Sequence, residues 1–339
     1  MNHTTNQATN QAALSAADPF IERVEQQLVE LLDNDLPPSD APDGELGAGA
    51  RHLALAPGAK RARPRLVWLF GEAVGADAAG LCDLAIAAEL IHTASLLHDD
   101  VVDNSGFRRG RTTANARWGN TAAILTGDLV LSTAIRQLAG HPPAITVAAV
   151  QAVADMSRAA LIEVRARDRV DVDEATWLQI ARGKTGALFG WCGRSAGLLA
   201  GDEDAAGRFE DCGRRFGVAF QLADDLKDFV RSGTGKPCLA DIRTGGPSRV
   251  LIVAAEADPS VAAALASLWS QSDRSEADVD ACARAVQNTD AIERCEAMLV
   301  DEVSAAIDAL GPWRDRPAGA RLARWARGLA DKYLQGATT

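Results

Sequence analysis

Residues 92–120 read HTASLLHDDVVDNSGFRRGRTTANARWGN and hold an acidic cluster followed closely by a basic one. Asp99, Asp100 and Asp103 form a DDxxD pattern, in which helical spacing puts Asp99 and Asp103 on one face. Three carboxylates gathered there repel one another unless a cation neutralises them. Because hard oxygen ligands suit Mg²⁺ better than Zn²⁺, the pattern predicts a magnesium site with room for substrate phosphates.

Arg108 and Arg109 follow the acids in a segment flanked by glycines. Guanidinium groups are planar and always charged, so this pair can hold phosphate oxygens through paired hydrogen bonds. The alternative is that all these charges form a solvated helix end. The apolar residues Leu97, Val101 and Val102 beside the acids argue against that alternative, because a freely solvated face is polar.

The DDxxD spacing recurs at Asp224, Asp225 and Asp228, again among apolar residues, in the segment FQLADDLKDF. Two such clusters are expected to face each other across a cavity. Carboxylates that bind several Mg²⁺ ions on one diphosphate would stabilise it as a leaving group, a role that needs no protein nucleophile. The repeat therefore favours magnesium-dependent diphosphate chemistry over a chance surface charge.

A second basic segment, PGAKRARPRL, comes directly before an apolar helix expected over residues 66–74. Lys60, Arg61 and Arg63 would lie at a helix N-terminus, where free N–H groups also favour anions. The alternative is a solubilising basic turn. Further on, Lys184 and Thr185 lie between glycines, which lets a phosphate approach closely, but their segment lacks the spacing of a nucleotide P-loop.

The composition favours a helical, soluble protein. The chain has 339 residues with few aromatic side chains, and its apolar content is mainly Ala, Leu and Val, which predicts an all-α fold. Its net charge of −11 argues against binding nucleic acid or anionic membranes through the whole surface. Six scattered cysteines show neither zinc-ligand nor disulfide spacing, which fits a reducing cytoplasm. No apolar run is long enough for a membrane-spanning helix.

Periodicity divides the chain into helices and loops. The expected helices include residues 81–97, 121–138 and 144–164. Residues 34–49 are rich in Pro and Gly and are expected to form a loop. Residues 1–18 are polar and are expected to form a flexible tail ahead of one domain over 19–339. Glu163 lies among arginines and is expected to pair with one of them.

Together these motifs resemble those of the trans-polyprenyl (isoprenyl) diphosphate synthase family, most like its long-chain type, from about Phe20 to near the C-terminus. The resemblance implies a single large helical bundle, the isoprenoid synthase type I fold, around a central cavity. It also implies a cytoplasmic, magnesium-dependent prenyltransferase, usually a homodimer, that condenses an allylic diphosphate with isopentenyl diphosphate (IPP) head to tail. About three Mg²⁺ ions would bind with substrate, and membrane contact would be at most transient, for product release.

The resemblance assigns roles to the residues that match family motifs. The Mg²⁺-binding acids would be Asp99, Asp100, Asp103, Asp224, Asp225 and Asp228. The allylic diphosphate would be held by Arg108, Lys184, Thr185, Gln221 and Lys236. The IPP diphosphate would be held by Lys60, Arg63, His92 and Arg109, with Arg61 beside them. All of the acids except Asp228, together with Lys184, are expected to be catalytic.

One loop departs from the family pattern. After an Asp-Leu pair the family reads Gly-Lys, whereas here Asp241-Ile242 leads to Gly245-Gly246, so a lysine is missing. Arg243 and Arg249 are the candidate substitutes, although a guanidinium is not equivalent to an ammonium group.

Small residues under the first acidic motif bear on product length. Ala94 and Ser95 lie about one turn before Asp99, where short-chain enzymes of the family place aromatic residues. Their small size predicts an open tunnel and a product longer than C20.

Three alternatives stay open. The first is a short-chain enzyme that makes geranylgeranyl or farnesyl diphosphate. The second is a non-catalytic subunit of a heteromeric prenyl synthase, suggested by the altered loop, although such subunits typically lose acids that this chain keeps. The third is a class I terpene cyclase, whose second metal motif mixes Asn or Asp, Ser or Thr, and Glu, unlike DDLKD here.

Overall fold

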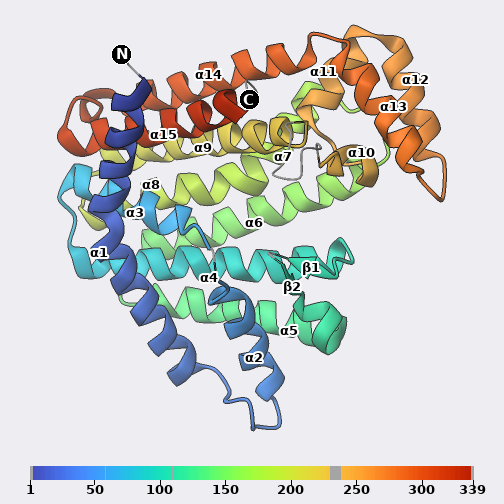
Figure 1. Ribbon diagram of the computed structural model, residues 1–339. Coiled ribbons are helices and arrows are strands. Elements are labelled where there is room, and N and C mark those ends of the chain that lie inside the picture. The colour runs from blue at the N-terminus through green and yellow to red at the C-terminus, as the bar shows by residue number, and fades with distance from the viewer. Residues whose placement is uncertain (1–2, 58, 109, 230–237, 337–339) are drawn as a thin grey trace. The chain divides into compact units, whose positions relative to one another are not determined.

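The computed structural model describes residues 3–57, 59–108, 110–229 and 238–336, with side chains from Asp18 to Gly328. Apart from one short hairpin, every regular element in these residues is a helix, which confirms the all-α prediction (Figure 1). The chain groups into two compact units. The first unit comprises Met1–Gln151, Trp191–Glu210 and Asp315–Leu322, and the second comprises Ala152–Gly190, Asp211–Arg314 and Ala323–Thr339.

The first unit is built around one long helix that carries the first acidic motif. Its elements are α1 (His3–Asp35), α2 (Gly44–Ala54), α3 (Ala62–Val74), α4 (Ala78–Val102), β1 (Phe107–Arg108), β2 (Arg111–Thr112), α5 (Ala114–Gln137) and the start of α6 (Pro143–Ala166). Helices α1, α2, α3 and α5 all contact α4, which makes α4 the core helix of this unit. The DDxxD motif lies at its C-terminal end.

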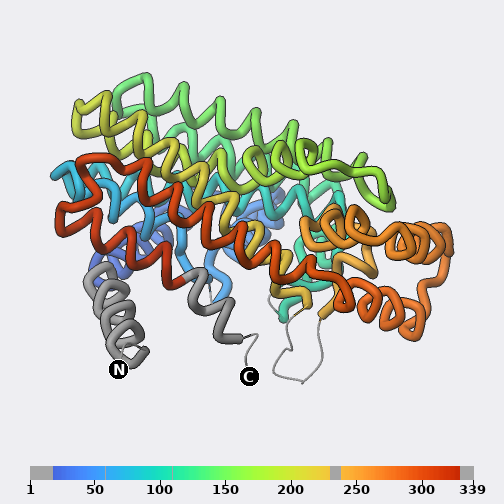
Figure 2. The backbone as a smooth tube through the Cα atoms, turned by 90° about the horizontal axis from the view of Figure 1, so that it is seen from above, coloured from blue at the N-terminus to red at the C-terminus, as the bar shows by residue number. Residues whose placement is uncertain are grey.

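The second unit carries the second acidic motif at the end of a long helix. Its own elements are α7 (Glu174–Ala181), the π-helix η1 (Arg182–Gly186), α10 (Ala240–Thr244), α11 (Arg249–Ala257), α12 (Pro259–Trp269), α13 (Glu276–Gln287), α14 (Ala291–Ala309) and the 3-10 helix η2 (Gly311–Trp313). Residues of α6, α8 (Ala187–Leu199), α9 (Glu203–Lys227) and α15 (Pro317–Gly336) belong to both units. The short helices α11 to α13 pack on one another, as the orange tube in Figure 2 shows.

Helix α2 begins inside the segment 34–49 that the sequence predicts to be a loop and takes up its last part, residues 44–49. Glycine inside a helix costs roughly 1 kcal/mol relative to alanine, so this glycine-rich stretch does not read as helical. In the structure its glycines permit close packing, because a Cβ on Gly47 would collide with the carbonyl oxygen of Pro37. A Cβ on Gly49 would lie 3.2 Å from the hydroxyl of Thr126 in α5. Tertiary contact therefore outweighs local propensity here.

The N-terminal segment also differs from its expected form. Residues 1–18 are expected to form a flexible tail, whereas the backbone of α1 is helical from His3. Val24, Leu28 and Leu32 of α1 are fully buried in the first unit. The boundary of a single domain at residue 19 stays a prediction.

Two helices are long and apolar enough to cross a membrane, by length and composition alone. Most of the apolar window of α4 is buried, 78%, as befits the core helix of the first unit. The corresponding window of α6 is only 22% buried, and Val147 and Val150 in its first half are exposed. The prediction that residues 144–164 form a buried helix is therefore right about the helix and wrong about the burial of one face.

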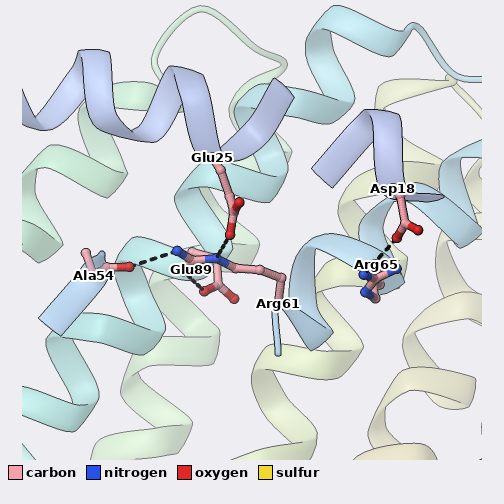
Figure 3. Close-up of polar contacts among 6 residues, drawn as sticks. All are labelled: Asp18, Glu25, Ala54, Arg61, Arg65 and Glu89. Atoms are coloured by element: carbon pink, nitrogen blue, oxygen red, sulfur yellow. Dashed lines mark hydrogen bonds and ion pairs between the residues drawn. The ribbon is translucent and has the colours of Figure 1, made fainter. Parts of the chain in front are cut away.

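Arg61 ties three helices of the first unit together from a buried position (Figure 3). Its Nη1 donates to Glu89 Oε2 of α4 at 2.7 Å, and its Nε donates to Glu25 Oε1 of α1 at 3.2 Å. Its Nη2 donates to the carbonyl of Ala54, at the end of α2, at 2.9 Å. Arg61 is 6% and Glu89 5% exposed, so this guanidinium holds the fold together rather than facing a substrate.

Replacing Arg61 should therefore cost far more stability than replacing the neighbouring Arg65. In Arg61→Met the Glu89 carboxylate stays buried without its cation, and we expect a loss of about 3–5 kcal/mol in the free energy of unfolding. In the control Arg65→Met, the ion pair that is lost is with Asp18, whose side chain is 50% exposed and stays hydrated, and we expect a loss below about 1 kcal/mol. Urea denaturation measures both values, and equal losses would contradict the structural role of Arg61.

Candidate functional site

The first acidic motif divides its carboxylates between the protein and the solvent. Asp100 is 1% exposed and its Oδ1 accepts a hydrogen bond of 2.7 Å from Arg108 Nε. Its carbonyl also accepts from Asn115 Nδ2 at 3.2 Å. Asp99 is half-buried and Asp103, at the end of α4, is exposed. Asp99 and Asp103 are therefore better placed than Asp100 to reach a bound ion.

Burial controls the charge of Asp100. It raises the pKa of this carboxyl above the usual range, and the hydrogen bond and positive charge of Arg108 oppose that rise. A nearby cation favours the ionised form of such a group. Arg108, predicted to hold the allylic diphosphate, thus also neutralises the innermost acid of the motif.

The β1–β2 hairpin that follows the motif is fixed by residues that the sequence analysis did not single out. Arg111 donates to the carbonyl of His52 at 3.1 Å and to His52 Nδ1 at 2.9 Å. His52 Nε2 lies 2.7 Å from the carbonyl of Thr112, so the ring donates from Nε2 and accepts at Nδ1. Asn115 also bonds to the carbonyl of Ser105 at 3.1 Å. These contacts hold Arg108 against Asp100.

The first basic motif places alternate side chains in different surroundings. Lys60 is exposed and Arg63 is half-buried, whereas Arg61 between them points into the core. The prediction that Arg61 helps to bind IPP is therefore corrected, because its guanidinium already donates hydrogen bonds to three protein groups. The residue also has a left-handed backbone, φ 47°, at the N-terminus of α3.

The product-length residues lie on α4 as predicted. Ala94 is 2% exposed, and Ser95 is half-buried with its hydroxyl donating to the carbonyl of His92 at 2.8 Å. The His92 side chain is half-buried on the same helix.

The second acidic motif shows the same division of carboxylates within the second unit. Asp225 is 3% exposed and accepts three hydrogen bonds, from Arg249 N at 2.7 Å, Trp177 Nε1 at 3.0 Å and Gln221 Nε2 at 3.0 Å. Asp224, one residue earlier, has a 61% exposed side chain with Lys227 at 3.4 Å. Of this adjacent pair, Asp224 is the carboxylate open to a metal.

Asp228, the last acid of the motif, organises the segment that follows. It is 7% exposed, its Oδ1 accepts from Ala240 N and its Oδ2 from Asp241 N, both at 2.8 Å. Its carbonyl accepts from Leu239 N at 3.1 Å. These amides begin α10, so Asp228 caps that helix from a distant position in the chain.

Burial and neighbouring negative charges raise the pKa values of two acids in this region, Asp225 and Asp241. Burial raises the pKa of Asp225, and the hydrogen bonds from Arg249, Gln221 and Trp177 lower it in part. Burial also raises the pKa of Asp241, and the charges of Asp225 and Asp228 add to that rise. A cation near these carboxylates would be favoured, because it would relieve their mutual repulsion.

The residues predicted to hold the allylic diphosphate connect to this motif. Thr185 in η1 donates from its hydroxyl to Gln221 Oε1 at 3.3 Å, and Gln221 in turn donates to Asp225. Lys184 pairs with Glu163 of α6 at 2.5 Å, which gives Glu163 a lysine partner, whereas the sequence analysis expects an arginine; the arginine pairing stays a prediction. The structure thus brings Lys184, Thr185, Gln221 and Asp225 into one unit of the protein.

Close helix packing explains the glycines around this group. A Cβ on Gly217 of α9 would collide with the Cα of Gly186 in η1. The π-helical turn and these two glycines let α9 approach the Lys184–Thr185 segment closely.

The candidate substitutes for the missing lysine have other partners. Arg243 bonds to Glu276 of α13 at 2.6 Å and to the carbonyl of Cys238. Arg249 is 2% exposed and pairs with Glu174 of α7 at 2.8 Å. Arg109 and Lys236, predicted to hold the two diphosphates, lie outside the described residues.

Trp177 and Glu174 are functional candidates that the sequence analysis missed. A signal for Trp177 was present, because it lies seven residues before Lys184, two turns along a helix on the same side. No local signal marks Glu174, whose partner Arg249 is far away in the chain.

Known proteins resemble this chain in sequence and in fold. The polyprenyl synthetase family model matches residues 47–286. An octaprenyl diphosphate synthase of Haemophilus influenzae is 34% identical over 241 residues, which cover 70% of each chain. Heptaprenyl diphosphate synthase component 2 of Geobacillus stearothermophilus is 36% identical over 260 residues, 75% of this chain and 80% of that one.

A solved structure agrees with these sequence matches. The polyprenyl synthase of Caulobacter crescentus, complexed with calcium and isoprenyl diphosphate, superimposes with a TM-score of 0.82 at 27% identity, over 94% of this chain and 97% of that one. Since the family model covers most of the chain as well, the chain belongs to the polyprenyl synthetase family and is a prenyltransferase of the polyprenyl diphosphate synthase type.

Proposed function

We propose that this protein elongates an allylic diphosphate with IPP head to tail, in the trans configuration, and releases a product longer than C20. The observation that carries this proposal is the division of carboxylates in both DDxxD motifs. The first motif anchors Asp100 in the protein and leaves Asp103 accessible, and the second anchors Asp225 and Asp228 and leaves Asp224 accessible. Accessible carboxylates on a fixed helix end suit ions that arrive together with a diphosphate.

The donor set fits Mg²⁺. No group of three or more His, Cys, Asp or Glu side chains in the described chain forms a metal site by itself. Mg²⁺ typically binds through one or two carboxylates and completes its shell with water and substrate phosphates, so the exposed acids are sufficient. Asp99, Asp103 and Asp224 would be direct ligands, and Asp100, Asp225 and Asp228 would fix the helix ends. Bound Mg²⁺ would neutralise the charge of the leaving diphosphate.

The basic and polar residues then divide between two substrates. Arg108, Lys184, Thr185, Gln221 and Lys236 would orient the allylic diphosphate, and Lys60, Arg63, His92 and Arg109 would hold that of IPP. Ionisation of the allylic substrate leaves a delocalised cation, the IPP double bond attacks it, and a proton is lost to the departed diphosphate. Lys184, which is paired with Glu163, would stabilise negative charge as it develops on the leaving group.

Product length rests on the helix below the first motif. Ala94 and Ser95 present no aromatic ring about one turn before Asp99, so nothing at these positions blocks a growing chain. The relatives reported above are named for octaprenyl and heptaprenyl products. Both observations support a long-chain product over a farnesyl or geranylgeranyl one.

Incubation of the purified protein alone with Mg²⁺, IPP and geranyl, farnesyl or geranylgeranyl diphosphate should give a polyprenyl diphosphate longer than C20, detected by mass. Removal of Mg²⁺ with EDTA should abolish product. A product no longer than C20 would overturn the chain-length proposal, and a hydrocarbon would indicate a cyclase. No condensation with any primer would favour the subunit of a heteromeric synthase, an alternative that the name of the Geobacillus relative, component 2, keeps relevant.

Substitution of the acids that would bind metal tests their role, when the rate of condensation and the melting temperature are both measured. Asp99→Asn and Asp224→Asn should each lower the rate by at least about 100-fold, because a charged ligand is lost, with little change in melting temperature. Asp211→Asn is the matched control, since Asp211 is also an exposed α9 carboxylate but pairs with Arg215. Its rate should stay within about twofold of the original.

We also propose that the protein forms a homodimer. Val147 and Val150 of α6 are 67% and 53% exposed, and Ile124 and Leu125 of α5 are 42% and 50% exposed, all within the first unit. Large apolar side chains exposed in this way are typical of surfaces that a second chain covers.

Light scattering on the purified protein should give the mass of a dimer, and Val147→Glu with Val150→Glu should shift it toward the monomer. Both changes place charge on an apolar contact, whereas the control Val300→Glu changes an exposed valine of α14 and should leave the dimer intact. A monomeric mass for the unchanged protein would contradict the proposal.

A further inference from the structure

The Asp225 carboxylate is held more completely than any role as a metal ligand requires. It is 3% exposed, and its Oδ2 receives both the Arg249 backbone N–H at 2.7 Å and the Trp177 indole N–H at 3.0 Å. Its Oδ1 receives the Gln221 amide at 3.0 Å. Because an oxygen of a carboxylate offers about two lone-pair sites, Oδ2 is saturated and the group cannot rotate without losing a donor.

The three donors come from three elements of the second unit. Trp177 belongs to α7, Gln221 to α9 itself, and the Arg249 amide begins α11. The position at the N-terminus of α11 adds favourable electrostatics, since free N–H groups there attract a negative charge. Asp225 is therefore a junction at which α7, α9 and α11 meet.

An ion pair between a buried arginine and a largely exposed glutamate joins two of these elements a second time. The Arg249 side chain is 2% exposed, and its Nη2 lies 2.8 Å from Glu174 Oε2. Glu174 begins α7, three residues before Trp177, and its side chain is 55% exposed. The pair thus fixes the start of α11 to the start of α7, and these are the two elements that donate to Asp225 Oδ2.

We propose that Trp177 and the Arg249–Glu174 pair are positioning residues for the second metal motif. They lock the Asp225 carboxylate, and Asp225 in turn holds the end of α9 at the angle from which Asp224 presents its exposed carboxylate. This inference rests on the proposed function, because it assigns these residues to Mg²⁺–diphosphate binding by Asp224. None of the three touches substrate in this role.

The substitution Trp177→Phe tests the proposal, because it keeps a buried ring and removes the indole donor. Trp191→Phe is the matched control: Trp191 is 2% exposed and its indole donates to the carbonyl of Ile145 at 3.1 Å, so an equivalent bond is lost. We measure two Mg²⁺ concentrations. The first gives half of the maximal rise in melting temperature in the presence of inorganic pyrophosphate, and the second gives half of the maximal rate. Trp177→Phe should raise both required Mg²⁺ concentrations about tenfold, and Trp191→Phe should leave them unchanged.

Glu174 supplies a second test that does not depend on the core. Since its side chain is largely exposed, Glu174→Leu should fold and should raise the Mg²⁺ requirement in the same direction. Glu174→Gln retains an acceptor for Arg249 and should recover most of the original value. If Trp177→Phe and Glu174→Leu both require the same Mg²⁺ concentration as the unchanged protein, the positioning role is overturned and the proposed function is left intact. Failure of the unchanged protein to bind Mg²⁺ with pyrophosphate would overturn both.

Discussion

Asp225 is a carboxylate with almost no access to water, and this constraint organises the second unit. A buried charge is costly unless hydrogen bonds replace its hydration, so three elements must each bring a donor to this one side chain. Asp228 imposes the same requirement on the start of α10 through two backbone amides. The acids that define the motif in the sequence therefore also determine how the surrounding helices pack.

The first unit also holds buried charges, but there each one is neutralised by a side chain of opposite charge. Asp100 is buried against Arg108, and Arg61 is buried against Glu89, so in each case one charged residue of a motif is used to hold the backbone. Its neighbours are then accessible: Lys60 beside Arg61, and Asp103 after Asp100. An enzyme that binds highly charged substrates needs accessible charges in fixed places, and pairing alternate residues internally provides both.

The sequence predicts the helical fold and the motifs well, because both depend on local pattern. Apolar periodicity identifies α4 and α6, and the repeated DDxxD spacing identifies the acids. The sequence does not show which acid of each motif turns inward, or that Arg61 is buried while Lys60 is exposed. Those outcomes depend on partners such as Glu89 and Trp177, which are distant in the chain. The start of helix α2 is missed for a related reason, since its glycines are explained only by their contacts with Pro37 and with Thr126 of α5.

The central claim is that the acids of one motif are divided between holding helices and binding metal. Its most direct test is the free energy of unfolding of the metal-free protein with Asp228→Ala or Asp224→Ala, measured in urea. Asp228→Ala strips the acceptor from two amides at the start of α10 and should cost about 2–4 kcal/mol, whereas Asp224→Ala removes an exposed carboxylate and should change stability by less than about 0.5 kcal/mol. Equal losses for the two variants would contradict the account.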